Sequence, residues 1–323
     1  MDLWTLTDLL TPWCVYVAVT LRVPEHIAAG KAGIAELAAA CGADRGYLYR
    51  MLQHLVSRGV FEEPAPGVFA LNETSRSLLS DGCRLYCDLD SFGGRIAYAW
   101  GTLLSAVRTG KPAYHEAFGR SYWDDLDAHP KIAADFDALM GVAGHGVPDP
   151  EVLPNPADWE SIRTVVDVGG GTGSLLAAIL QARPQVRGTL VDMPRAVAGS
   201  AEVFREAGVR DRAAAVAQNF FDPLPAGGDL YTLKNVLCDW PDEQALAILK
   251  RCAEAARPSG RVVVFNNSGP GEPASPELLM MVLVGGRDRT FEELNAIARE
   301  AGLEMRAHGR QASGRWIIEY LPV

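Results

Sequence analysis

Three glycines are the residues whose type and spacing most directly suggest chemistry. Gly169, Gly171 and Gly173 follow the apolar run 164–168, and a helical pattern over 174–180 comes next. Glycine is needed where a ligand approaches the backbone too closely for a side chain. A strand, a glycine turn and a helix in this order are typical of a loop that binds a nucleotide-like ligand.

The spacing of the glycines, together with a later acid, narrows the choice of ligand. The order is Gly-x-Gly-x-Gly, whereas a dinucleotide fingerprint would put Ser174 at its third glycine. No Gly-Lys-Ser/Thr follows, which excludes a Walker-type loop. Asp192 ends the run 188–192, where a carboxylate can accept hydrogen bonds from both ribose hydroxyls. This pattern favours S-adenosylmethionine (SAM), with a NAD-type ligand or a purely structural loop as alternatives.

The flanking residues predict the fold that must position this loop. Apolar runs at 230–233 and 261–265 enclose a helical pattern at 242–256. Alternating strands and helices indicate a parallel, doubly wound α/β sheet, whose ligands bind at the carboxyl ends of the strands. We therefore expect a Rossmann-like SAM-binding catalytic domain over residues 159–323.

The first 90 residues predict a separate helical unit. A helix at 33–41, a second that begins after Asp44, and a hairpin at 59–71 follow the winged-helix order. Residues 1–90 hold seven Lys/Arg against eleven Asp/Glu, which disfavours DNA binding because that affinity depends on phosphate neutralisation. We interpret residues 1–90 as a winged-helix-like dimerisation domain, so the protein is expected to be a homodimer.

Residues 91–158 read as a helical connector, and a cluster of prolines at 148–156 marks its end. The whole chain has 323 residues, a net charge of −10 and 48% hydrophobic residues. An acidic chain without an apolar run of ~18 residues predicts no nucleic-acid or membrane partner. The N-terminus is acidic and lacks a signal-peptide pattern, and the six cysteines lack metal-ligand spacing. These features predict a cytoplasmic protein with free thiols and no metal.

Several ordered motifs resemble the SAM-dependent small-molecule O-methyltransferases of the plant caffeate type, particularly their actinobacterial natural-product relatives. The matching segments span nearly the whole chain: TLRVPEHIAAG (20–30), VVDVGGGTG (165–173), LVDMPRAV (190–197), FFDPLP (220–225), LKNVLCDWPDE (233–243) and GGRDRT (285–290). The resemblance implies the cofactor residues position by position. Gly169, Gly171 and Gly173 would face the methionine part of SAM, Asp192 the ribose and Met193 the adenine. Asn219 replaces the family's usual carboxylate near the adenine, with Phe220 beside it, and Lys234 matches a lysine near the cofactor.

The resemblance places the catalytic set at three positions, and all three depart from the family pattern. Cys238 stands before Asp-Trp where the family has its general base, a histidine. Asn266 and Asp288 stand where two glutamates flank that histidine. A thiol with an ordinary pKa of about 8.5 is a poorer base at neutral pH than imidazole, so alignment of the reactants would have to replace general-base help. His145 is the alternative candidate for a base.

Three functions remain open, two of them enzymatic and one non-catalytic. The first is methyl transfer to a hydroxyl of an aromatic or polyketide-like secondary metabolite, by positioning rather than by a His base. The second is a SAM-binding enzyme of the same fold that performs hydroxylation, decarboxylation, cyclisation or a pericyclic reaction. The third is a non-catalytic dimeric binding module. The resemblance implies that the connector 91–158 lines the substrate pocket, with acceptor contacts at Phe136, Met140, Trp240, Asn267, Met280 and Leu283.

Overall fold

The computed structural model describes residues 2–141 and 146–323. Its contacts divide the chain into two compact units: Met1–Tyr98 with Ala134–Leu139, and Ala99–Ala133 with Met140–Val323. The predicted domain boundaries after residues 90 and 158 do not coincide with this division and stay predictions. His145 lies outside the described residues.

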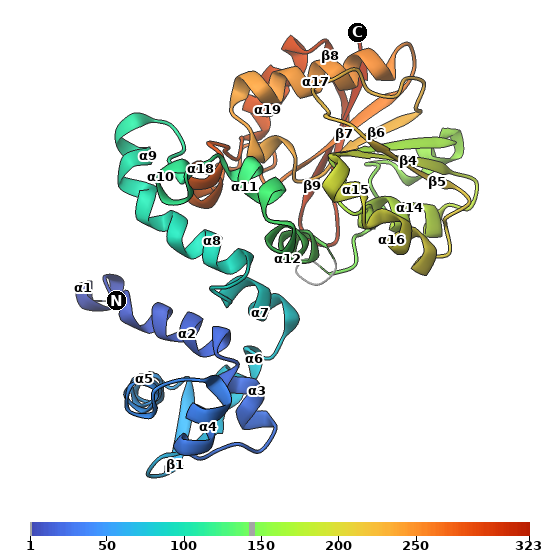
Figure 1. Ribbon diagram of the computed structural model, residues 1–323. Coiled ribbons are helices and arrows are strands. Elements are labelled where there is room, and N and C mark those ends of the chain that lie inside the picture. The colour runs from blue at the N-terminus through green and yellow to red at the C-terminus, as the bar shows by residue number, and fades with distance from the viewer. Residues whose placement is uncertain (1, 142–145) are drawn as a thin grey trace. The chain divides into compact units, whose positions relative to one another are not determined.

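The first unit is built from short helices and one two-stranded hairpin (Figure 1). Its elements are α1 (Leu3–Leu6), α2 (Leu10–Thr20), α3 (Val23–Ala28), α4 (Ile34–Cys41), α5 (Arg45–Ser57), β1 (Phe61–Ala65), β2 (Val68–Leu71), α6 (Glu73–Ser77), α7 (Asp81–Cys87) and most of α8 (Phe92–Ala99). Asp44 caps α5 as predicted, because its carboxylate accepts the amide hydrogens of Gly46 and Tyr47. Leu37, Leu52 and Phe69 are fully buried in its core. The winged-helix order expected from the sequence is therefore present.

The second unit is a sheet with helices on both faces (Figure 1). Its strand order is β5-β4-β3-β6-β7-β9-β8, in which β3 (Thr164–Val168), β4 (Arg187–Asp192), β5 (Ala213–Ala217), β6 (Leu230–Leu233) and β7 (Arg261–Asn266) are parallel. The carboxyl ends of β3 and β4 lie side by side, since Val168 pairs with Val191. The expected doubly wound sheet is present, and it brings the glycine loop next to Asp192.

The sheet is mixed rather than wholly parallel, which corrects the prediction. β8 (Leu303–Arg310) and β9 (Trp316–Pro322) form a hairpin that joins β7 in antiparallel register. Its turn needs only a few residues, so no crossover helix announces it in the sequence. The hairpin carries Arg315 to a position beside β7, where it becomes part of the site.

Helices cover the two faces of this sheet and create two hydrophobic cores. α14 (Ser174–Ala182) and α16 (Ser200–Glu206) enclose the core around Leu176 and Phe204, while α17 (Asp242–Ala256) and α19 (Phe291–Glu300) enclose the core around Ile248 and Leu294. The remaining elements of this unit are η1 (Trp100–Thr102), α9 (Leu103–Thr109), α10 (Tyr114–Phe118), α11 (Tyr122–Ala128), η2 (Pro156–Ser161), α15 (Pro194–Val197), η3 (Leu237–Asp239) and α18 (Leu278–Leu283). α12 (Pro130–Met140) contributes residues to both units.

Candidate active site

The three positions of the loop require glycine for different structural reasons. All have positive φ, at 67° for Gly169, 60° for Gly171 and 87° for Gly173, a region that side chains rarely adopt. A Cβ at Gly169 would lie 2.6 Å from Val236, and one at Gly173 would lie 2.8 Å from the Phe204 ring. A Cβ at Gly171 would meet nothing within 4 Å. Gly171 therefore presents the open face of the loop, whereas the other two permit close packing.

Asp192 holds the glycine loop from the adjacent strand. Its Oδ2 accepts the Gly171 amide hydrogen at 2.7 Å, and its Oδ1 accepts the Met193 amide hydrogen at 2.7 Å. Burial raises the pKa of this carboxyl, and the two backbone donors oppose that shift. Each carboxylate oxygen keeps a second lone pair, so the side chain can brace the loop and still accept from a ribose.

A second acid, Asp167, lies beneath the loop. It is buried, and its Oδ1 accepts the Thr232 hydroxyl hydrogen at 2.7 Å. Burial raises its pKa to about 6, against the opposing hydrogen bond from Thr232. A Cβ at Gly170 would lie 2.3 Å from its Oδ2, so Gly170 is glycine because of this carboxyl rather than because of a ligand. Asp167 thus packs against Gly170 of the loop and is hydrogen-bonded to β6, a role that the sequence does not indicate.

The other predicted cofactor positions lie near this loop. The Phe220 ring lies 3.6 Å from the place of a Cβ on Gly169. Asn219 accepts the Phe221 amide hydrogen at 3.0 Å, and its exposed amide group can still donate hydrogen bonds. Lys234 is half-buried, and its pKa is lowered by burial and by the charge of Arg315. An open glycine backbone, an acceptor at Asp192 and an amide at Asn219 fit the groups of SAM, although the individual contacts stay predictions.

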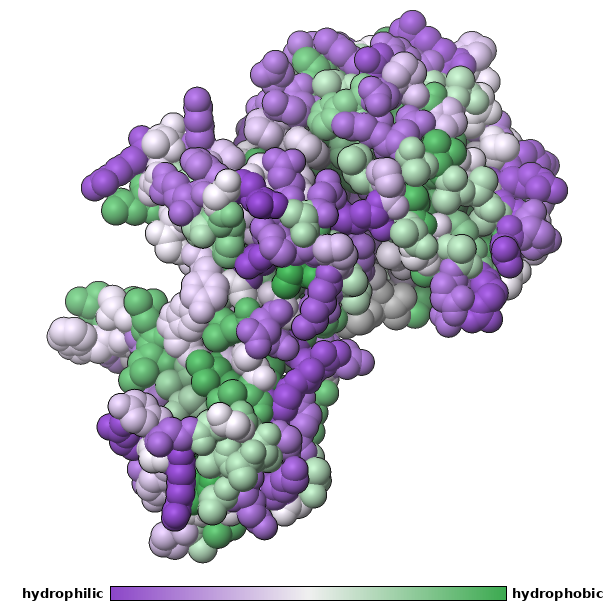
Figure 2. All heavy atoms as spheres, viewed as in Figure 1, coloured by the Kyte–Doolittle hydropathy of each residue, from purple (hydrophilic) through white to green (hydrophobic). Residues whose placement is uncertain are grey.

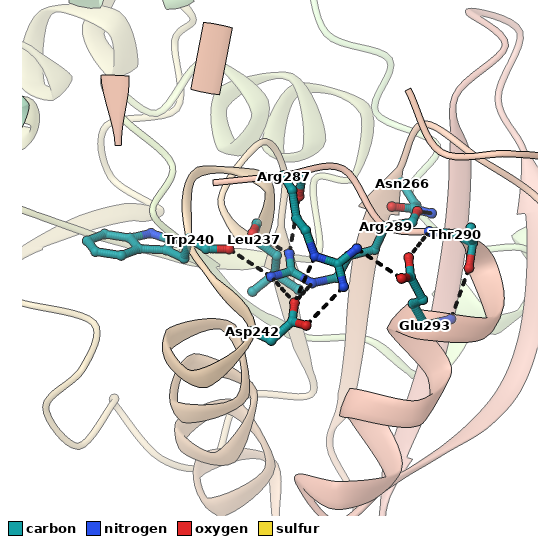
Figure 3. Close-up of polar contacts among 8 residues, drawn as sticks. All are labelled: Leu237, Trp240, Asp242, Asn266, Arg287, Arg289, Thr290 and Glu293. Atoms are coloured by element: carbon teal, nitrogen blue, oxygen red, sulfur yellow. Dashed lines mark hydrogen bonds and ion pairs between the residues drawn. The ribbon is translucent and has the colours of Figure 1, made fainter. Parts of the chain in front are cut away.

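The turn that carries the predicted catalytic position is fixed by Arg289 (Figure 3). This guanidinium, only 2% exposed, donates to the Leu237 carbonyl at 2.6 Å and to the Trp240 carbonyl at 2.7 Å. Its Nε donates to Asp242 at 3.0 Å, and Arg287 binds the same carboxylate at 2.9 Å. A buried, paired arginine of this kind costs stability when its partners are removed. Both arginines lie in the GGRDRT motif, which gave no signal of this bracing role.

The three predicted catalytic positions, Cys238, Asn266 and Asp288, line one small pocket. Asn267 and Arg315 also line it. The Cys238 thiol donates to Asp239 Oδ1 at 3.6 Å. Burial, followed by the charges of Asp239 and Asp288, raises the pKa of this thiol well above its usual range. A neutral thiol is a poor base and a poor nucleophile. The structure thus groups the predicted trio but gives Cys238 the properties of a neutral wall residue.

The two asparagines have structural partners. Asn266 Nδ2 donates to the carbonyls of Ser268 at 2.8 Å and Arg289 at 3.0 Å, which ties β7 to the segment before α19 (Figure 3). Asn267 Nδ2 donates to Asp288 Oδ2 at 2.8 Å. Both donated bonds of Asn266 are therefore used to position the chain, and an amide group in either asparagine does not act as a proton acceptor.

A separate aromatic cavity of about 330 Å³ lies beside this turn. Its walls are Pro112, Tyr114, His115, Ser121, Tyr122, Trp123, Trp240, Leu283 and Val284. It includes two of the predicted acceptor contacts, Trp240 and Leu283. The lining adds residues of α10 and α11, which lie in the segment 91–158 that we interpret from the sequence as a connector lining the substrate pocket, although the sequence singles out none of them as an acceptor contact.

The other predicted acceptor residues lie elsewhere within the structure. Phe136 packs against Phe92 in the first unit, with ring centroids 5.1 Å apart. Met140 is exposed, Met280 is half-buried on α18, and Asn267 faces the small pocket. Their roles toward an acceptor stay predictions.

Comparison with known families matches the chain to an O-methyltransferase domain over residues 100–304 and an O-methyltransferase dimerisation domain over residues 4–81. The chain therefore belongs to this O-methyltransferase family. This confirms the expected family and fold class, an O-methyltransferase enzyme class and SAM as the cofactor. Within residues 2–141 and 146–323, no helix is long and apolar enough to cross a membrane.

Two curated relatives differ in their reactions. The chain is 42% identical over 312 residues to a 2,7-dihydroxy-5-methyl-1-naphthoate 7-O-methyltransferase of Streptomyces carzinostaticus, which covers 95% of this chain and 93% of that protein. It is 37% identical over 312 residues to an aclacinomycin 10-hydroxylase of Streptomyces purpurascens, covering 93% and 83%. An O-methyltransferase structure from neocarzinostatin biosynthesis, in complex with SAM and 2-hydroxy-5-methyl naphthoic acid, aligns with a TM-score of 0.91 at 39% identity, covering 100% of this chain and 99% of that one.

Proposed function

We propose that the protein transfers the methyl group of SAM to a hydroxyl of a fused-ring aromatic secondary metabolite. The observation that carries this proposal is the aromatic cavity, whose Trp240 also contacts Phe220 beside the glycine loop, with ring centroids 6.0 Å apart. A cavity of about 330 Å³ suits a compact, flat acceptor. Relatives named for naphthoate and neocarzinostatin chemistry support an acceptor of this class.

The chain's own residues would contribute chiefly by alignment. Gly171 and Asp192 would hold the cofactor, and SAM when bound supplies a methyl group on a positively charged sulfur. Trp123 and Trp240 would fix the plane of the acceptor. Holding two reactants in attack geometry can replace much of the entropy cost of their encounter.

The second candidate is a SAM-binding enzyme that hydroxylates the acceptor with dioxygen and two electrons from a reductant in solution, and leaves SAM unconsumed. It is favoured by the neutral Cys238 in place of a histidine, and by the 37% identity to an aclacinomycin 10-hydroxylase. Methyl transfer remains the first proposal because the more similar of the two curated relatives is an O-methyltransferase.

One experiment separates the two candidates. The protein is incubated in air with SAM, 1,4-dihydroxy-2-naphthoic acid and a thiol reductant, and the masses of SAM and of the naphthoate are followed. A methylated naphthoate together with S-adenosylhomocysteine supports methyl transfer. An oxygenated product with unconsumed SAM supports the second candidate and rejects the first. Cys238→His is the matched variant: a histidine base should raise the methylation rate, but it should not affect a reaction that needs no proton transfer there.

We also propose that the protein is a homodimer formed through its N-terminal unit. The leucines and tryptophan of its first helices are exposed, with Trp4 82% and Leu9 74% accessible. Figure 2 shows apolar side chains gathered over α1 and α2. A monomer rarely leaves such a patch in water. The match to a dimerisation domain over residues 4–81 supports the same partner, a second copy of this chain.

A further inference from the structure

Methyl transfer to a neutral hydroxyl releases a proton, and that proton needs an acceptor. Alignment of the reactants does not supply one. The predicted catalytic positions do not supply one readily: Cys238 is a neutral thiol that donates its own hydrogen, and both Asn266 amide hydrogens are committed to carbonyls. Asp288 is 6% exposed and accepts a hydrogen bond from Asn267.

Asp239 lies, along the chain, between residues that line the two hollows of the site, and its Oδ1 is 3.6 Å from the Cys238 thiol of the small pocket. Its predecessor, Cys238, lines the small pocket, and its successor, Trp240, lines the aromatic cavity. Its carboxyl lies deep in the protein, but the residue keeps some accessible surface, whereas Asp288 is almost fully enclosed. Asp239 therefore belongs to the turn that carries lining residues of both hollows.

The segment around Gly286 packs directly against this turn. A Cβ on Gly286 would lie 2.1 Å from the Cys238 carbonyl oxygen and 2.7 Å from Asp239 Cα. Leu283 and Val284, just before it, line the aromatic cavity, and Asp288, just after it, lines the small pocket. The segment 283–288 therefore packs along the turn that contains Asp239, and its residues line both hollows.

We propose that Asp239 accepts the proton of the acceptor hydroxyl, an inference that rests on the proposed methyl transfer. The hydroxyl oxygen forms a bond to the methyl carbon of SAM while the carbon–sulfur bond breaks. The electron pair of that bond goes to sulfur, and the hydroxyl proton goes to the Asp239 carboxylate. Solvent then takes this proton, since the residue keeps some accessible surface.

The groups around Asp239 make it a stronger base than an ordinary carboxylate. The acidic neighbours are Glu277, which precedes α18, and Asp288, while the Cys238 thiol donates to it and the cationic Arg289 brackets the same turn. Burial first, and then the charges of Glu277 and Asp288, raises the pKa of Asp239 to about 7, against the opposing thiol hydrogen bond. A general base is most effective when its pKa is near the working pH.

The test uses the full-length protein, SAM and a set of naphthols of graded acidity. Asp239→Asn should lower kcat about 100-fold for weakly acidic naphthols, at the lower end of general-base effects, and have little effect on naphthols that are already ionised. Affinity for SAM should not change. A loss that is equal for all naphthols, or no loss, overturns the role of Asp239. Asp211→Asn, on an exposed loop, is the matched control and should have no effect.

The pH profile separates Asp239 from Asp288. Wild-type kcat for a weakly acidic naphthol should rise with an apparent pKa near 7, and Asp239→Asn should abolish that rise. Asp288→Asn should keep the rise but move it to lower pH, because a negative neighbour is removed. If Asp288→Asn abolishes the rise while Asp239→Asn keeps it, Asp288 is the base and the proposal is wrong. A wild-type protein that methylates no naphthol contradicts the proposed function itself, which is a distinct result.

Discussion

Trp123 and Trp240 stack on each other, with ring centroids 6.2 Å apart and planes inclined by 21°. Trp123 comes from α11 and Trp240 follows η3, so the pair joins two segments far apart in the sequence. Trp240 also meets Phe221 edge to face, at 5.0 Å and 89°. The Trp240 ring thus lines the aromatic cavity and also contacts the two phenylalanines that follow Asn219.

Loss of the Trp123 ring should weaken acceptor binding. We expect Trp123→Ala to raise KM for a naphthol about tenfold, or about 1.4 kcal/mol, which is at the upper end for one aromatic pair. Steady-state kinetics checks this, with Trp123→Phe as the control that keeps a ring and most of the affinity. An unchanged KM for Trp123→Ala would place the acceptor outside this cavity.

Gly171 should be required for SAM, and Gly208 provides a matched control. Both have positive φ, at 60° and 66°, and a Cβ at either would meet nothing within 4 Å. Alanine should therefore cost both sites similar strain, about 1 kcal/mol of folding stability. Only Gly171→Ala should also reduce SAM affinity, by about tenfold or more, as measured by titration calorimetry. Equal SAM affinity in the two variants would argue against a ligand at the open face of the loop.

Gly286 should be intolerant of any side chain. Its Cβ would lie 2.1 Å from the Cys238 carbonyl oxygen, so Gly286→Ala must displace the turn. We expect a loss of about 1–3 kcal/mol in the free energy of unfolding, typical of overpacking, together with a lower kcat. Denaturant titration measures the first quantity. Gly101→Ala, whose Cβ would have no neighbour within 4 Å, should show neither effect.

The buried Asp167 should make folding stability depend on pH. Its pKa rises from an ordinary 3.8 to about 6 in the folded protein, so the unfolded chain releases this proton first. Stability from this group is therefore lost as the pH rises from about 4 to 6. Asp167→Asn lacks that loss, and its stability relative to wild type should increase by up to about 3 kcal/mol over that range.

A second variant tests the cause of that pH dependence. Thr232 donates a hydrogen bond that holds the Asp167 pKa down, so Thr232→Val should extend the loss of stability to higher pH. Denaturant titrations at a series of pH values measure both effects. A wild-type protein and an Asp167→Asn variant with parallel pH profiles would show that this carboxyl is not buried as described.

The exposed apolar residues of the first helices should support dimerisation. Trp4→Ser combined with Leu9→Ser should convert the dimer to a monomer at micromolar concentration, because both side chains would lose buried apolar area. Sedimentation equilibrium checks this. Val323→Ser removes an equally exposed apolar side chain at the other end of the chain and should leave the dimer intact.

Most of the fold could be predicted because its signals are local. The run 164–168, the glycines after it and the acid at 192 define strand, loop and strand end without any distant partner. Asp44 was identifiable as a helix cap for the same reason. β8 and β9 were missed because their pairing with β7 depends on contacts distant in sequence, and β5 was missed because its run of alanines has little strand character.

The site was predictable in its cofactor half and much less so in its acceptor half. The glycine loop is one continuous segment, whereas the aromatic cavity combines α10, α11, η3 and α18, which only the tertiary structure brings together. The bracing by Arg289 could not be read from the sequence either, since its partners are backbone carbonyls that carry no side-chain signature. Burial, which sets the states of Cys238 and Asp239, is likewise a property of the folded chain.

The way Arg289 holds its turn bears on how this enzyme could acquire new chemistry. The guanidinium grips main-chain oxygens on both sides of positions 238 and 239, so the shape of the turn depends little on which side chains those positions bear. A change of one codon there alters the reactive groups while the scaffold that presents them persists. A lineage can thus exchange the proton acceptor at these positions, or lose it, while the main-chain contacts that shape the turn are kept.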